Sequence, residues 1–103
     1  MNQELRDTAD TTPLMAAATK GDVATIRDIL ANGGSVDEAD AEGWTPLMFA
    51  ARNGCTEAVK VLLDAGANPN AEDVFQRSVL ELAEEFEYTE IEQLLRGRRT
   101  AFA

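Results

Sequence analysis

The sequence predicts an all-α protein in which three helix-turn-helix units stack side by side and loops project between them. The first observation is a 33-residue repeat: Thr12–Met15 (TPLM) returns as Thr45–Met48 (TPLM) and, less closely, as Ser78–Glu81 (SVLE). The second is the spacing of apolar residues by three and four positions within the middle unit. The third is the placement of proline and glycine at the helix ends that this spacing implies. A fixed period of this length indicates an array of small supersecondary units.

Residues 1–11 are expected to form a lead-in and a half-loop, because Asp7–Thr11 aligns with Asp40–Trp44 one period later. The first unit is predicted to span residues 12–44. Three small residues of the first unit recur 33 positions later in the second: Ala17 as Ala50, Gly21 as Gly54 and Gly33 as Gly66. The projecting loops share an aspartate at Asp40 and Asp73.

The middle unit, residues 45–77, begins with a helix that has clear end signals. Thr45 is suited to cap the helix, and Pro46 fits the first turn, where a missing N–H costs nothing. An apolar stripe follows at spacing i, i+3, i+4: Leu47, Ala50 and Ala51. Gly54 is expected to end the helix in a left-handed conformation. Small alanines on the stripe would let a neighbouring helix approach closely.

The second helix of this unit is expected to begin at Thr56 and to end at Ala65-Gly66. Its stripe repeats the same spacing with Val59, Leu62 and Leu63. The polar, turn-rich segment from Asn68 to Asp73 then predicts a projecting loop. Because neither helix can bury its stripe alone, the units must pack against one another.

The third unit is predicted at residues 78–96, followed by a basic tail at residues 97–103. Two positions grow more apolar along the array and should face the preceding unit: Thr25, Ala58, Ile91 and Asp28, Val61, Leu94. Two others become polar at the third unit and should face the following one: Ile26, Val59, Glu92 and Leu30, Leu63, Arg96. This pattern predicts an array that is capped by polar faces at both ends, and therefore a monomer.

These residues resemble the ankyrin repeat over about residues 7 to 96. The resemblance is carried by Thr45–Gly54 (TPLMFAARNG) and Gly66–Asp73 (GANPNAED), which follow the family's Thr-Pro-Leu-His, Ala-Ala-x-x-Gly and Gly-Ala-Asp-x-Asn-Ala-x-Asp patterns. The family's histidine is replaced by Met15, Met48 and Glu81, which implies softer loops rather than another fold. The resemblance implies a solenoid that grips a partner protein on a concave face of first helices and loop tips.

Composition argues against catalysis and against a metal site or cofactor. The chain has no histidine and a single cysteine, Cys55, so serine–histidine and cysteine–histidine catalysis are excluded. Zinc sites need cysteine and histidine sets that are absent. The acidic segment 37–43 departs from a calcium loop, because its glycine falls one place late and Met48 stands where a glutamate is required. We therefore expect no enzyme activity, no metal and no cofactor.

The charge balance bears on the kind of partner. Nineteen acidic against nine basic residues give a formal net charge of −10, which disfavours nucleic acids and anionic membranes. A basic protein surface would be attracted, although acidity alone also serves solubility. Since Cys55 cannot form an internal disulfide and no signal peptide or membrane-length apolar run is present, a cytoplasmic location is predicted.

The predicted function is non-enzymatic protein binding, as an adaptor or scaffold; an inhibitory or regulatory subunit that masks a partner's site is the alternative. On the resemblance, the contact positions are Ala41, Glu42 and Trp44 on one loop, Val74, Phe75 and Arg77 on the next, and Thr19, Lys20, Arg52 and Asn53 at the helix edges. Trp44 and Phe75 are the candidate anchors, because aromatic residues are enriched in binding hot spots. Trp44 could instead pack against the neighbouring loop.

Overall fold

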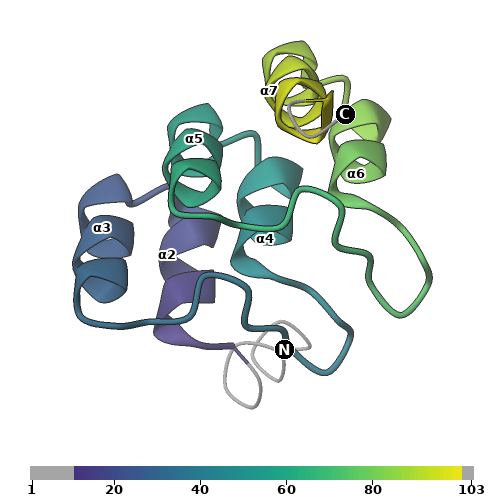
Figure 1. Ribbon diagram of the computed structural model, residues 1–103. Coiled ribbons are helices and arrows are strands. Elements are labelled where there is room, and N and C mark those ends of the chain that lie inside the picture. Colours follow the sequence, from purple (N-terminus) through teal and green to yellow (C-terminus); the bar gives the residue numbers. More distant parts are fainter. Residues whose placement is uncertain (1–10, 101–103) are drawn as a thin grey trace.

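In the part of the chain that the structure describes, six helices form three antiparallel pairs that follow one another in sequence order (Figure 1). The computed structural model describes the backbone of residues 11–100 and the side chains of residues 11–97, so all but the last residue of the predicted lead-in and half-loop over residues 1–11 lies outside the described residues. The helices are α2 (Pro13–Lys20), α3 (Val23–Ala31), α4 (Pro46–Arg52), α5 (Thr56–Asp64), α6 (Val79–Glu85) and α7 (Thr89–Thr100).

The helices lie in two layers, because each first helix packs on the next first helix and each second helix on the next second helix. One layer contains α2, α4 and α6, and the other contains α3, α5 and α7. The loops that join α3 to α4 and α5 to α6 extend from the same side of the helices (Figure 1). The predicted all-α stack of helix-turn-helix units with projecting loops is confirmed.

A hydroxyl side chain caps the first helix of every unit, as the repeat of Thr12, Thr45 and Ser78 predicts. Each hydroxyl oxygen accepts a hydrogen bond from the backbone N–H three residues on, at 3.2, 3.4 and 3.1 Å respectively. In the third unit the Glu81 carboxylate also accepts from the Ser78 N–H at 2.8 Å, which completes a capping box. The third unit has Val79 where the other units have proline at the first helical position, and the capping box stabilises the start of its helix instead.

The predicted apolar stripes form the core between the helices. Leu47, Ala50 and Ala51 of α4 are fully buried, and so are Val59 and Leu62 of α5. Alanines allow close packing in the first layer, whereas larger aliphatic side chains fill the second. Burial of these stripes is the main source of stability, at about 25 cal/mol for each Å² of apolar surface removed from water.

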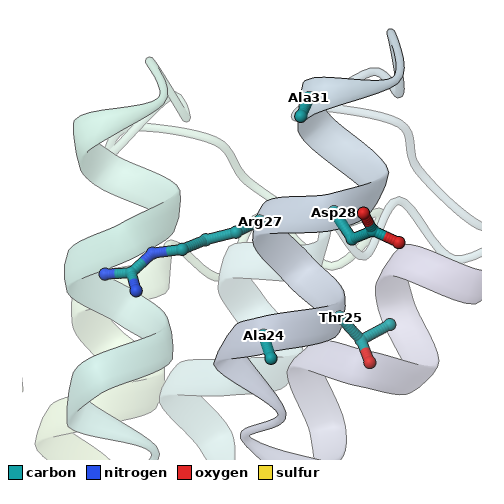
Figure 2. Close-up of a pocket in the computed structure, with 5 residues that line it drawn as sticks. All are labelled: Ala24, Thr25, Arg27, Asp28 and Ala31. Carbon is teal, nitrogen blue, oxygen red and sulfur yellow. The ribbon is translucent and has the colours of Figure 1, made fainter.

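The N-terminal end of the array is polar, as predicted. Thr25 and Asp28 are exposed on α3, and Figure 2 shows them projecting from one side of that helix while Arg27 extends from the other. Together with Ala24 and Ala31 they line a shallow depression of about 620 Å³. Among residues 11–97, no large apolar side chain lines this depression.

The third unit also turns polar groups outward. Arg96 is exposed, and its Nη2 lies 2.6 Å from a Glu84 carboxylate oxygen and 3.9 Å from one of Glu92, the i, i+4 partner expected from the sequence. The helix α7 continues to Thr100, past the predicted end of the unit at Arg96, so the first residues of the predicted basic tail are helical. Within the described residues, no helix is long and apolar enough to cross a membrane.

Candidate functional site on the concave face

The two described loops are built on the same hydrogen-bonded frame. In the first loop, Oδ1 of Asp40 accepts from the N–H groups of Glu42 and Trp44, both at 2.9 Å. In the second, Oδ1 of Asp73 accepts from the N–H groups of Phe75 and Arg77, again at 2.9 Å. The repeated aspartate therefore folds each loop into a tight turn, which fixes the residues at its tip.

Asp73 also ties the two loops together. Its Oδ2 accepts from Trp44 Nε1 at 3.0 Å and from Arg77 Nε at 3.0 Å, and it pairs with Arg77 Nη2 at 2.9 Å. Burial of the Asp73 side chain raises the pKa of its carboxyl, but the hydrogen bonds from Arg77, Phe75 and Trp44 outweigh it, so the net pKa lies below its ordinary value. The carboxylate form thus holds both loop tips in place.

Trp44 is buried, with an exposed fraction of 4%. Its ring lies 5.1 Å from the Phe49 ring, and the guanidinium groups of Arg52 and Arg77 lie over it at 5.7 and 5.9 Å. This is the packing against the neighbouring loop that the sequence left open as the alternative. Loss of this side chain should therefore affect the fold, since the buried tryptophan contacts two loops and a helix.

A cavity of about 210 Å³ opens beside Trp44, between the two loops and the first-layer helices α4 and α6, on the side that the sequence predicts to be the concave face. It is lined by Glu42, Trp44, Arg52, Arg77, Leu82, Glu85 and Phe86. Four predicted site residues, Glu42, Trp44, Arg52 and Arg77, therefore meet there although they come from two loops and a helix. Phe75 does not line the cavity, but it neighbours Arg77, whose guanidinium lies 5.4 Å from its ring centre.

The other predicted contact residues do not line this cavity. Thr19 and Lys20 are exposed at the end of α2, and Asn53 and Ala41 are exposed at the end of α4 and on the first loop. The Thr19 hydroxyl donates to the Met15 carbonyl, and the Asn53 amide donates to the Phe49 carbonyl, both at 2.9 Å. Both side chains are thus held along their own helices.

Three cavity residues, Leu82, Glu85 and Phe86, were not predicted from the sequence. Glu85 and Phe86 stand one period after Arg52 and Asn53, so carrying the helix-edge positions into the third unit would have found them. Phe86 is 43% exposed and stacks on Tyr88, with ring centres 5.8 Å apart. The weaker resemblance of the third unit hid this correspondence.

Cys55 is half-buried beside Gly21. Burial raises the pKa of its thiol above the ordinary value, which lowers the fraction of reactive thiolate at neutral pH. In the part of the chain that the structure describes, no three cysteine or acidic side chains gather as a metal site.

Comparison with known proteins agrees with this architecture. Residues 1–73 match the family described as ankyrin repeats in three copies. A relative from Carollia perspicillata, "Ankyrin repeat, SAM and basic leucine zipper domain-containing protein 1", is 50% identical over 54 residues. That alignment covers 52% of this chain and 11% of the relative. Helices α6 and α7 lie beyond the family match but continue the same stack. The chain belongs to the ankyrin-repeat family, whose repeats are generally protein–protein interaction modules.

Proposed function

We propose that this protein is a non-enzymatic adaptor or scaffold that binds a partner protein on the concave face, around the cavity beside Trp44. The observation that carries the proposal is the position of Phe75 and Phe86. Their exposed fractions are 68% and 43%. Phe86 lines the cavity, and Phe75 lies against Arg77, which also lines it. Aromatic side chains, phenylalanine among them, are enriched at protein–protein interfaces.

The charged groups of this face define the partner further. Glu85 forms no ion pair among the described residues, whereas Arg52 lies over the Trp44 ring and Arg77 is held by Asp73. With a net charge of −10, the protein would attract a partner that has a basic surface.

A half-buried thiol without a disulfide partner supports a reducing, cytoplasmic setting.

The test is a pull-down from a cytoplasmic lysate with wild type and the double variant Phe75→Ser/Phe86→Ser. The variant should lose specific bands while its melting temperature stays within a few degrees of wild type, because both side chains are largely exposed. The matched control is Ala24→Ser/Arg27→Gln on the opposite, polar face of α3, which should keep every band. If both variants retain the same bands, the concave face is not the surface that binds the partner.

Trp44 is a poor probe of binding, since its loss should affect the fold. We expect Trp44→Ala to lower the free energy of unfolding by about 3–5 kcal/mol, as measured by urea denaturation. If the Trp44→Ala variant has the same urea midpoint of unfolding as wild type, Trp44 is not the structural link that its burial indicates.

A further inference from the structure

The two arginines that line the cavity beside Trp44 each lie over an aromatic ring of this chain. The Arg52 guanidinium is 5.7 Å from the centre of the Trp44 ring. The Arg77 guanidinium is 5.9 Å from the same ring and 5.4 Å from that of Phe75, and it is paired with the Asp73 carboxylate at 2.9 Å. This face therefore holds its own guanidinium groups against aromatic rings and, for Arg77, against a carboxylate as well.

Glu85 and Phe86 offer the same two groups, a carboxylate and a ring, without a guanidinium between them. Both residues line the cavity, and they are adjacent in sequence at the end of α6. Over the side chains that the structure describes, Glu85 forms no ion pair and no cation lies over the Phe86 ring. One side chain that enters the cavity can therefore contact both groups.

The Phe86 ring is held in place for such a contact. It stacks on the Tyr88 ring at an interplanar angle of 22°, with ring centres 5.8 Å apart. The Tyr88 ring in turn packs against Gly54, where a Cβ atom would lie 2.9 Å from Cζ of Tyr88. Phe86 nevertheless remains 43% exposed. Because its neighbours already support the ring, little side-chain freedom is lost when a ligand stacks on it.

The charges at the ends of the first helices also favour a cation at this position. The last turn of α2 carries Lys20 and that of α4 carries Arg52, whereas that of α6 carries no basic residue. Glu84 and Glu85 stand there instead, and Glu84 is paired with Arg96. Since the carbonyl end of a helix is itself electronegative, the end of α6 and the Glu85 carboxylate both attract a positive charge.

The exposure of Glu85 and Phe86 does not depend on where the described array ends. Their equivalents in the second unit, 33 positions earlier, are Arg52 and Asn53. The second unit packs against a unit on either side, and yet both of these residues are exposed. These positions are therefore open to a ligand within the array as well as at its last described unit.

A basic occupant suits the cavity better than an acidic one. Asp73 neutralises Arg77, so Arg52 is the base that remains, while the carboxylates of Glu42 and Glu85 both line the cavity. Arginine suits it better than lysine, because a planar guanidinium can stack on a ring while two of its N–H groups donate to one carboxylate.

We propose that Glu85 and Phe86 form a pocket for an arginine side chain. The guanidinium stacks on the Phe86 ring and donates to the Glu85 carboxylate, and the aliphatic part of the side chain lies along Leu82, which also lines the cavity. That this arginine belongs to a partner protein rests on the proposed function, whereas the pocket itself rests on the unpaired carboxylate and the supported ring.

The probe is an acetylated and amidated tripeptide with arginine between two alanines, titrated into the ¹⁵N-labelled full chain. Saturable shifts are expected at the amides of Leu82, Glu85 and Phe86. The tripeptide with citrulline, which keeps the shape of arginine without its charge, should bind at least about tenfold more weakly, and that with lysine several-fold more weakly. Equal affinity of either peptide, or absence of saturable shifts at these amides, would overturn the inference.

Two charge-matched variants test the carboxylate. Glu85→Gln should weaken binding of the arginine tripeptide by about tenfold. Glu90→Gln removes one negative charge from an exposed position of α7 that does not line the cavity, and it should bind as wild type. If the two variants bind equally, Glu85 does not pair with the arginine.

The ring is tested by Phe86→Leu and Phe86→Tyr. The first keeps an apolar side chain without a ring and should bind several-fold more weakly, and the second keeps the ring and should bind as wild type. Melting temperatures of both variants show whether the fold is retained. A folded Phe86→Leu variant with wild-type affinity would contradict stacking on this ring.

A pull-down with Glu85→Gln separates this inference from the proposed function. The variant should lose the specific bands that Phe75→Ser/Phe86→Ser loses. If it keeps them, the concave face binds its partner without an arginine in this pocket, and the inference alone fails. If the tripeptide binds as expected but the wild type captures no specific band, the proposed function alone fails.

Discussion

At the scale of single residues, Asp73 has the largest role in shaping the candidate site. Its two carboxylate oxygens accept hydrogen bonds from the backbone of its own loop, from Arg77 and from Trp44 of the preceding loop. The side chain is fully buried, so water cannot replace a lost partner. The geometry of both loop tips therefore depends on this one carboxylate.

The stability of the protein should depend on the ionisation of Asp73. Because the folded-state pKa is lowered, the unfolded state binds this proton more readily, and the stabilisation is present above about pH 4, the ordinary value. It should be lost as the pH falls through the folded-state pKa. We expect Asp73→Asn to cost about 2 kcal/mol at pH 7 and to make the acid-induced fall shallower.

Urea denaturation between pH 7 and pH 2.5 measures both effects. Glu72→Gln, which changes the exposed carboxylate next in sequence, should retain wild-type stability at pH 7. An Asp73→Asn variant whose free energy of unfolding falls with acid as steeply as that of wild type would contradict the role given to this carboxylate.

At the scale of the elements, glycines at the helix ends set how closely the units approach. Gly54 ends the turn after α4 with φ of 71°, and the Tyr88 ring lies where its Cβ would be. Gly21 makes the same approach to Cys55 of the second unit. The residue that follows each glycine by 34 positions therefore packs directly over it.

A double-mutant cycle can separate the two costs of a side chain at Gly54. Gly54→Ala should lower the free energy of unfolding by about 1–2 kcal/mol from the left-handed conformation and by about 1–3 kcal/mol more from overlap with Tyr88. In a Tyr88→Ala background the second cost should disappear. Thermal or urea unfolding of the four proteins gives the coupling, and equal costs in both backgrounds would mean that Tyr88 does not constrain this position.

At the scale of the whole molecule, the array has polar faces on both of its described ends. Thr25 and Asp28 are exposed at one end, and Arg96 with its carboxylate partners at the other. Stacking of two copies end to end would bury these groups without apolar gain. The apolar stripes instead meet within the chain, between successive units.

We therefore expect a monomer at micromolar concentration in sedimentation velocity at physiological salt. The substitutions Thr25→Ala and Asp28→Val, which give the first unit the residues of the second, should promote association through α3. End-to-end oligomers of the wild-type protein would contradict the capping of the array.

Much of the fold could be predicted from the sequence, because the signals for helix ends and apolar stripes are local. The hydroxyl caps at Thr12, Thr45 and Ser78 act within a single turn, and the stripe Val59, Leu62, Leu63 follows from helix geometry alone. The 33-residue period then requires the units to stack in order. These features need no knowledge of distant contacts.

The tertiary structure decided which loop residues are available to a partner. Trp44 and Phe75 are both aromatic and lie only two positions apart in the common frame of equivalent loops, yet one is 4% and the other 68% exposed. The difference arises from Asp73, which is 29 positions away from Trp44 and accepts its indole N–H only because the loops stack. A repeat pattern defines the position of a side chain in its own unit, but its exposure depends on what the next unit places against it.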